Sequence, residues 1–216
     1  MPSGRRLPDP LGGGPSDQRG LQGNRENQQG FKSTSDGGLR EWKTRFVFWY
    51  QKKMWMQKSQ NLAKKISEDY AGRQVHLVCV LKGGVFFMCE LAKRITVPVT
   101  MDFMSVSSYG AGTESSGVVK IVKDLDQPLD GKDVLIVEDI VDSGRTLGYL
   151  MEILRKRNPK SLHLCTLLDK PERRVTDVKV DYTGFNIPDE FVVGYGLDYA
   201  QKYRNLPYIG VVEGVE

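Results

Sequence analysis

The chain has 216 residues, of which 39% are hydrophobic, so it is long enough for one α/β domain with a sizeable core and some additional sequence. Its formal charge of +4 is uneven, because residues 1–65 carry 13 of the 31 basic but only 5 of the 27 acidic side chains. The remaining part, residues 66–216, has a net charge of −4, so the overall charge does not indicate nucleic-acid binding. We expect no nucleic-acid partner.

The N-terminal region differs in composition from the rest of the chain. Residues 1–38 contain nine of the 23 glycines and almost no apolar side chains, which predicts a disordered tail. Residues 39–56 contain all three tryptophans among Lys and Arg. This second segment is compatible with a strand packed on the protein body, a membrane-surface helix or a partner-binding site.

From about residue 57 the hydrophobic pattern becomes regular. Helical spacing of apolar residues predicts helices in the segments NLAKKISEDYAG, GVFFMCELAKRI and TLGYLMEILRKR, the first of them ended by Gly72. Short apolar runs predict buried strands at 75–81, 133–139 and 161–169, and further extended segments at 99–109 and 118–122. Strands that alternate with helices imply a doubly wound, mostly parallel sheet in an α/β fold.

The sequence contains neither a membrane-spanning segment nor a secretory signal. No apolar run approaches the roughly 18–20 residues that a membrane helix needs, and no apolar stretch follows the basic N-terminus. Cys79, Cys89 and Cys165 lie far apart in apolar surroundings, which predicts buried, reduced thiols. We therefore expect a cytoplasmic protein without a membrane partner.

The most informative stretch is VLIVEDIVDSGRT at 134–146. It places Glu138 and Asp139 at the carboxyl end of a predicted buried strand, where ligands of open parallel sheets bind. An acidic pair alone is also compatible with an ordinary polar strand end. The following Asp-Ser-Gly-Arg-Thr lies where a helix begins, and free N–H groups at a helix N-terminus bind phosphate. Carboxylates beside a monophosphate site suit a sugar phosphate, because they accept hydrogen bonds from ribose hydroxyls.

This acidic pair with DSGRT resembles the 5-phosphoribosyl 1-diphosphate (PRPP) binding motif of the type I phosphoribosyltransferases. Residues 58–212 resemble the bacterial hypoxanthine-guanine phosphoribosyltransferases in particular. Four further segments carry this resemblance: VLKGG (80–84), SSYG (107–110), LLDKPERR (167–174) and IPDEFVVGYGLDYAQKYRNLPYIG (187–210). It implies transfer of the phosphoribosyl group from PRPP to hypoxanthine or guanine, which gives IMP or GMP and pyrophosphate, on a core covered by a small hood.

The resemblance assigns roles to the residues around the central motif. Glu138 and Asp139 would bind the ribose hydroxyls, and the 5-phosphate would be held by Ser143, Gly144, Arg145 and Thr146. Asp142 would face nitrogen 7 of the base and accept a proton as nitrogen 9 attacks. The alternative for Asp142 is a helix N-cap, a position that Asp also favours.

The resemblance also assigns residues to the pyrophosphate and to a metal ion. Lys82, Gly83 and Arg204 would bind pyrophosphate, after a Leu81-Lys82 peptide that can be cis in the family. Asp198, together with Glu138 and Asp139, would help to hold Mg²⁺ on the pyrophosphate. Without the resemblance, an exposed ion pair is the simpler interpretation of Asp198 and Arg204.

The remaining assignments concern the lid and the base. Ser108 and Tyr109 would belong to a mobile lid that excludes water. Lys170 would donate to the 6-oxo oxygen of the purine, which adenine lacks. Phe191 would stack on the base, and the backbone of Val192 would bind the edge of the base.

One part of the chain departs from the family pattern. Residues 1–54 match nothing expected there, whereas 55–216 form the predicted phosphoribosyltransferase domain. The first segment is compatible with a basic, largely disordered extension or with an aberrant start that replaces the usual first strand. All predicted site residues lie downstream of it.

Other functions remain open at this point. A regulator that binds PRPP without turnover is one alternative, and a xanthine-preferring enzyme is another. An orotate or adenine enzyme of similar core is disfavoured by Lys170 and by the C-terminal segment. Members of the family form dimers and tetramers, so the resemblance implies a homodimer or homotetramer.

Overall fold

The computed structural model describes residues 46–50, 52–108 and 119–212. The predicted disordered tail at 1–38 lies outside the described residues. Tyr109, one of the two predicted lid residues, also lies outside them.

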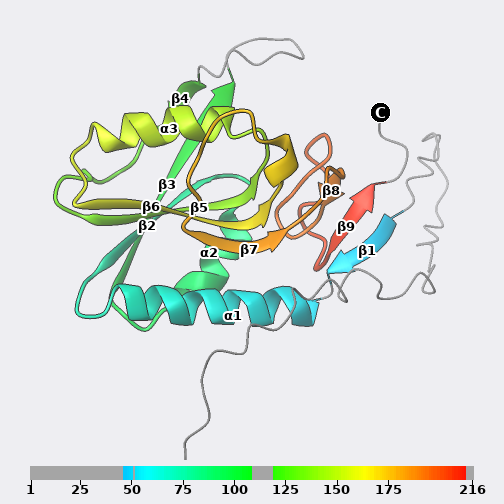
Figure 1. Ribbon diagram of the computed structural model, residues 1–216, viewed down its shortest axis with the longest axis horizontal. Coiled ribbons are helices and arrows are strands. Elements are labelled where there is room, and N and C mark those ends of the chain that lie inside the picture. Colours follow the sequence, from blue (N-terminus) through cyan, green and yellow to red (C-terminus); the bar gives the residue numbers. More distant parts are fainter. Residues whose placement is uncertain (1–45, 51, 109–118, 213–216) are drawn as a thin grey trace, which may run out of the picture. The chain divides into compact units, whose positions relative to one another are not determined.

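The main sheet contains six strands in the order β4-β3-β2-β5-β6-β7. Neighbouring strands pair in parallel, except that β4 is antiparallel to β3. This arrangement confirms the predicted α/β fold with a mostly parallel sheet (Figure 1). The strands are β2 (Val75–Leu81), β3 (Val99–Ser108), β4 (Val119–Lys123), β5 (Asp133–Val141), β6 (Ser161–Asp169) and β7 (Tyr182–Asn186).

Helices cover both faces of this sheet, as Figure 1 shows. The helices α1 (Lys52–Asp69) and α2 (Val85–Ala92) lie on one face, and α3 (Arg145–Arg155) lies on the other. Side chains of a strand point alternately to the two faces. In β2, Leu77 therefore packs in the core beneath α1 and α2, while Val78 packs in the core beneath α3. Burial on both faces explains why the central strands are almost wholly apolar.

A second, small sheet has the strand order β1-β9-β8. Its strands are β1 (Phe46–Tyr50), β8 (Val192–Val193) and β9 (Ile209–Val212), and both outer strands are antiparallel to β9. Of the three alternatives for the tryptophan-rich segment, the strand is the one found at 46–50. The predicted N-terminal segment thus supplies a strand that pairs with the C-terminal part of the chain.

The first helix is longer than predicted, because it begins at Lys52. Its additional turns bury Trp55 and Ser59, and the Ser59 hydroxyl donates to the Trp55 carbonyl at 2.8 Å. The helix ends before Gly72, whose φ of +72° lies in the left-handed region that favours glycine. Gly72 therefore has the predicted role of ending this helical segment.

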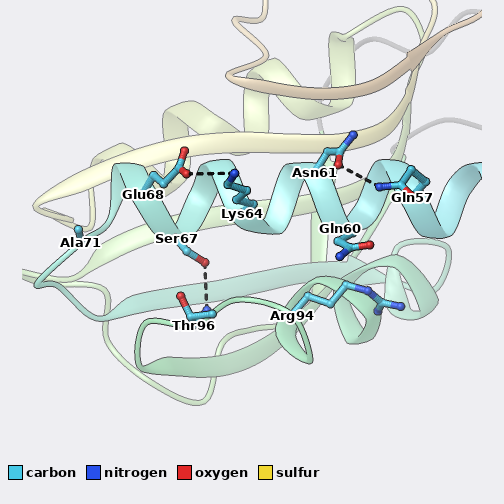
Figure 2. A pocket seen from close by; sticks show the side chains of 9 residues that line it. All are labelled: Gln57, Gln60, Asn61, Lys64, Ser67, Glu68, Ala71, Arg94 and Thr96. Atoms are coloured by element: carbon cyan, nitrogen blue, oxygen red, sulfur yellow. Dashed lines mark hydrogen bonds and ion pairs between the residues drawn. The ribbon is translucent and has the colours of Figure 1, made fainter.

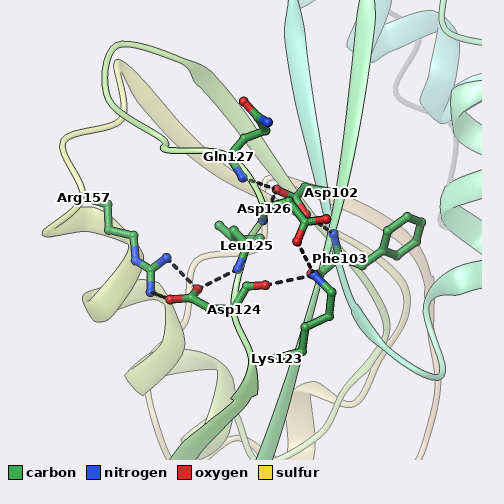
Figure 3. A network of polar contacts seen from close by, with 8 residues as sticks. All are labelled: Asp102, Phe103, Lys123, Asp124, Leu125, Asp126, Gln127 and Arg157. Carbon is green, nitrogen blue, oxygen red and sulfur yellow. Dashed lines mark hydrogen bonds and ion pairs between the residues drawn. The ribbon is translucent and has the colours of Figure 1, made fainter.

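A buried carboxylate fixes the connection that follows β4, as Figure 3 shows. Asp102 of β3 is buried and accepts hydrogen bonds from the N–H groups of Asp126 and Gln127, at 2.9 and 3.0 Å. Arg157 beyond α3 donates to both carboxylate oxygens of Asp124, at 2.7 and 3.0 Å. These contacts hold the chain between β4 and β5 against its neighbours and lie apart from the predicted site residues.

Two further expectations concern the cysteines and the membrane. Cys79 and Cys165 are buried, as predicted, but Cys89 is exposed. The error arose because Cys89 lies on α2 between buried residues, and the helical period turns its side chain away from the core. Within the described ranges, no helix combines the length and the apolar character that crossing a membrane requires.

Candidate active site

The acidic pair lies at the carboxyl end of β5, between β2 and β6. Glu138 and Asp139 are both half-buried, and the Asp139 carboxylate accepts a hydrogen bond from the Ile140 N–H at 2.9 Å. Burial and the neighbouring Asp139 charge raise the pKa of Glu138 well above its usual value. Burial raises the pKa of Asp139 to about 6, although nearby Arg204 opposes the shift. Two carboxylates kept together in this way are typical of a binding site.

The loop from Asp142 to Thr146 leads directly into α3, which begins at Arg145. Gly144 has a φ of +79°, and a Cβ at this position would lie 2.8 Å from the Thr176 carbonyl oxygen. The Ser143 carbonyl accepts hydrogen bonds from the N–H groups of Val175 and Thr176, at 3.0 and 3.2 Å. The segment after β6 therefore holds this loop in shape, and the N-terminal end of α3 favours an anion.

The glycine-containing turn after β2 contacts the acidic pair. A Cβ on Gly83 would lie 1.6 Å from Asp139 Oδ2, and a Cβ on Gly84 would lie 3.0 Å from the Val137 carbonyl oxygen. The Leu81-Lys82 peptide is cis, as the resemblance implied. Lys82 is exposed, and its Nζ donates to Gln201 Oε1 at 3.1 Å. A side chain at position 83 would therefore displace the carboxylate of Asp139.

The C-terminal segment closes on the same turn. A Cβ on Gly196 would lie 2.0 Å from the Gly83 carbonyl oxygen. Arg204 Nη1 donates to the Gly196 carbonyl at 2.7 Å, and Arg204 Nη2 lies 2.6 Å from Asp198 Oδ1. The structure therefore brings together Gly83, Asp139, Asp198 and Arg204, which were predicted from three separate motifs.

The residues predicted to bind the base lie at the ends of β6 and β8. Lys170 follows β6 and is buried, with its Nζ 3.4 Å from Asp189 Oδ1. Val192 is buried in β8, whereas Phe191 is exposed and meets Tyr199 edge to face. An exposed aromatic ring offers a face to a flat ligand, and a buried lysine offers a hydrogen-bond donor.

Asp142 is half-buried and forms an ion pair with Arg173, in which Asp142 Oδ1 lies 3.0 Å from Arg173 Nε. The N-cap of α3 is Gly144, two residues after Asp142, so Asp142 is not the N-cap residue. Of the two predicted lid residues, Ser108 ends β3 and Tyr109 lies outside the described residues.

A polar groove along α1 is a second candidate for a ligand site (Figure 2). Its side chains pair with one another, since Gln57 donates to Asn61 at 3.2 Å and Lys64 lies 3.9 Å from Glu68. Ser67 accepts a hydrogen bond from the Thr96 N–H at 3.0 Å. None of the predicted site residues lines this groove, and its side chains do not converge on a common point.

Comparison with known proteins shows the family of this chain. Residues 50–200 match the family model described as phosphoribosyl transferase domain. The chain belongs to the phosphoribosyltransferase family. A hypoxanthine-guanine phosphoribosyltransferase of Streptococcus thermophilus is 54% identical over 156 residues, which cover 72% of this chain and 87% of that protein. A hypoxanthine phosphoribosyltransferase of Salmonella typhimurium is 57% identical over 153 residues, with 70% and 86% covered.

A solved structure of a phosphoribosyltransferase has the same fold. The crystal structure of a hypoxanthine phosphoribosyltransferase from Staphylococcus aureus superposes with a TM-score of 0.76 at 47% identity, and covers 77% of this chain and 91% of that one. The resemblance to this group of phosphoribosyltransferases, inferred from five motifs, is thereby confirmed.

The ion pairs of Arg173 with Asp142 and with Asp189 in this phosphoribosyltransferase were not predicted. Arg173 and Asp189 belong to the quoted motifs LLDKPERR and IPDEF, yet no role followed for either of them. Both carry charge next to a predicted base-binding residue, and that proximity along the chain was the available signal. The boundary at residue 55 stays a prediction, although β1 and the family match both begin before it.

Proposed function

We infer that this chain transfers the 5-phosphoribosyl group from PRPP to a 6-oxopurine, hypoxanthine or guanine, and thereby forms IMP or GMP and pyrophosphate. The observation that carries this inference is the meeting of Gly83, Asp139 and Gly196 beside the loop that opens α3. Relatives that share more than half of the aligned residues are named for this activity.

The ribosyl phosphate would bind at the end of β5. Glu138 and Asp139 are proposed to accept hydrogen bonds from the two ribose hydroxyls. Both carboxylates are half-buried and have lost hydrogen bonds to water, and the hydroxyls would replace those bonds. The 5-phosphate is proposed to bind the loop of Ser143 to Thr146, because this loop leads into the N-terminal end of α3 and a helix N-terminus favours an anion.

The base would be activated by Asp142 and selected by Lys170. Asp142 is proposed to take the proton from nitrogen 7 as nitrogen 9 attacks the anomeric carbon, a role supported by its partly exposed carboxylate. Lys170 is proposed to donate to the 6-oxo oxygen. A base that offers no acceptor to this buried ammonium group would bind more weakly, because an unpaired buried donor is energetically costly. Phe191 would stack on the base, and the Val192 backbone would contact its edge.

Pyrophosphate would leave along the turn after β2. Lys82, the Gly83 backbone and Arg204 are proposed to bind it, because positive charge there offsets the charge that develops on the leaving group. Ser108 and Tyr109 are proposed to cover the site, so that water does not capture the activated ribosyl group.

The residues present fit a magnesium ion that is held mainly by the substrate. Asp139 and Asp198 lie near enough for the charge of Asp198 to raise the pKa of Asp139, although Arg204 pairs with Asp198 and opposes this effect. Mg²⁺ is commonly bound by one or two carboxylates together with substrate phosphates. Bound there, the ion would neutralise charge on the pyrophosphate.

Two broader properties are also proposed, a location in the cell and an oligomeric state. The three cysteines are free, which is consistent with a cytoplasmic location. A homodimer or homotetramer follows only from the family resemblance. No observation favours a PRPP-binding regulator or a xanthine-preferring enzyme over the proposed activity.

A base-panel assay tests the proposed function. The purified full chain with PRPP and Mg²⁺ is expected to convert hypoxanthine or guanine to the nucleotide, and adenine at a far lower kcat/KM. Removal of the metal by EDTA is expected to lower the rate. Xanthine serves to separate the alternatives, because a higher kcat/KM with xanthine would support the xanthine-preferring enzyme. Absence of turnover with all four bases would leave the regulator as the function.

A further inference from the structure

Arg173 contacts two carboxylates that come from separate parts of the chain. Its Nε lies 3.0 Å from Asp142 Oδ1 in the loop after β5, and its Nη1 lies 3.0 Å from Asp189 Oδ2 in the segment before β8. The two contacts use two different edges of one planar guanidinium group. The Asp189 contact is a hydrogen bond, whereas the Asp142 contact is an ion pair only, since Asp142 Oδ1 has no hydrogen-bond partner among the described residues. One guanidinium group can face two carboxylates in this way, which a single ammonium group cannot do.

Asp189 in turn contacts Lys170, whose Nζ lies 3.4 Å from Asp189 Oδ1. Lys170 is buried, and a buried ammonium group is costly unless a counter-charge lies near it. The four side chains therefore form a continuous series of alternating charge: Asp142, Arg173, Asp189 and Lys170.

The backbone holds the same residues together. Lys170 and Arg173 flank the 3-10 helix η2 (Pro171–Arg173), in which the Arg173 N–H donates to the Lys170 carbonyl at 3.1 Å. The Lys170 N–H donates to the Val141 carbonyl at 2.9 Å, directly before Asp142. The backbone of Lys170 is thus fixed relative to Asp142, and Arg173 adds the connection between the side chains.

We propose that Arg173 is a positioning residue that orients Asp142 and, through Asp189, Lys170, so that the two groups that act on the base are aligned by one guanidinium. This inference rests on the proposed function of Asp142 and Lys170. Arg173 itself touches neither the base nor the ribosyl group in this proposal. Its side chain is 47% exposed, so its ion pairs contribute little to folding, and their value lies in orientation.

The test compares four variants of the full chain. Arg173→Gln is expected to lower kcat/KM for hypoxanthine by roughly 10-fold to 100-fold, because a small misplacement of a reacting group has effects of that order. It is also expected to reduce the preference for hypoxanthine over adenine and to leave the KM for PRPP unchanged. Asp189→Asn is expected to reduce the base preference with a smaller loss of kcat, because Asp142 keeps its partner.

Arg157→Gln is the matched control, because it removes a guanidinium that binds the carboxylate of Asp124 outside the site. It is expected to leave kcat and base preference unchanged. Arg173→Lys is expected to recover part of the kcat but not both functions, since one ammonium group replaces a two-sided fork. Arg173→Lys also carries the test if Arg173→Gln does not fold.

The outcomes separate this inference from the proposed function. Absence of turnover in the unaltered chain would overturn the proposed function itself. An active chain in which Arg173→Gln and Arg173→Lys both keep the kcat and the base preference of Arg157→Gln would overturn the role of Arg173. A loss confined to the KM for PRPP would also overturn it, since that result would make Arg173 part of the phosphate site.

Discussion

The carboxylates at the end of β5 illustrate how a binding residue can work against folding. Burial raises the pKa of Asp139 to about 6, which means that the folded chain favours the neutral form of this group. At neutral pH the charged form is nevertheless the one that accepts hydrogen bonds from ribose hydroxyls. The buried charge lowers the stability of the folded chain, and we expect it to be kept because the ligand binds to it.

Asp139→Asn is expected to stabilise the free protein above pH 6 and to weaken PRPP binding. The carboxyl pKa is about 6 when folded and 3.8 in the reference state, so between these values the folded chain binds more protons. The free energy of unfolding of the unaltered protein therefore decreases as the pH rises through this window. Asparagine removes that loss, which amounts to about 1–3 kcal/mol for a half-buried group.

Urea unfolding at pH 5 and pH 8 measures this effect. The gain from Asp139→Asn is expected to be larger at pH 8 than at pH 5. The exposed Asp130→Asn is the control and is expected to follow the pH dependence of the unaltered protein. An equal gain at both pH values would show that charge burial is not its cause.

At the scale of the elements, the small sheet joins the two ends of the described chain. β9 pairs with β1 on one side and with β8 on the other, and β8 contains Val192, which is proposed to contact the base. Loss of β1 would leave one edge of β9 unpaired, and an unpaired edge weakens a short sheet. The first strand therefore has a predicted effect on base binding although it supplies no site residue.

A pair of deletions separates the N-terminal tail from this strand. Deletion of residues 1–38 is expected to leave activity and the thermal midpoint unchanged. Deletion of residues 1–50 also removes β1, and is expected to lower the thermal midpoint and to raise the KM for hypoxanthine more than that for PRPP. An inactive but folded 1–38 deletion would show a functional tail, and an unaffected 1–50 deletion would show that β1 is dispensable.

The elements also show which parts of the fold a sequence reveals. The strands β2, β5 and β6 were predicted because burial on both faces makes them continuous apolar runs. β7 was missed because Tyr182–Asn186 is short and contains glycine and asparagine, which are unfavourable in strands. β1 remained one of three alternatives, since its pairing with β9 depends on residues at the other end of the chain.

In the site too, features formed by neighbouring residues in the sequence were predictable, and contacts between distant segments were not. The acidic pair and the loop of Ser143 to Thr146 were predictable because their residues are adjacent in the sequence. The contact of Gly83 with Asp139 and the bridge from Arg173 to Asp142 join separate segments, so only the folded chain shows them. Local motifs therefore predicted where the ligand binds, but not how its binding groups are held.

For the molecule as a whole, PRPP and the nucleotide product are proposed to bind where β5 is followed by α3. The turn after β2, the segment after β6 and the C-terminal segment all converge on this junction. Every role proposed for the chain depends on that location. The groove along α1 offers a different location and serves as the comparison.

A crystal structure of the full chain with its product nucleotide tests this binding location. The expected result has the ribose hydroxyls within hydrogen-bonding distance of Glu138 and Asp139, the 5-phosphate on residues 143–146 and the base beside Lys170. A nucleotide bound instead in the groove of α1, or bound at the junction with its ribose away from both carboxylates, would contradict the account.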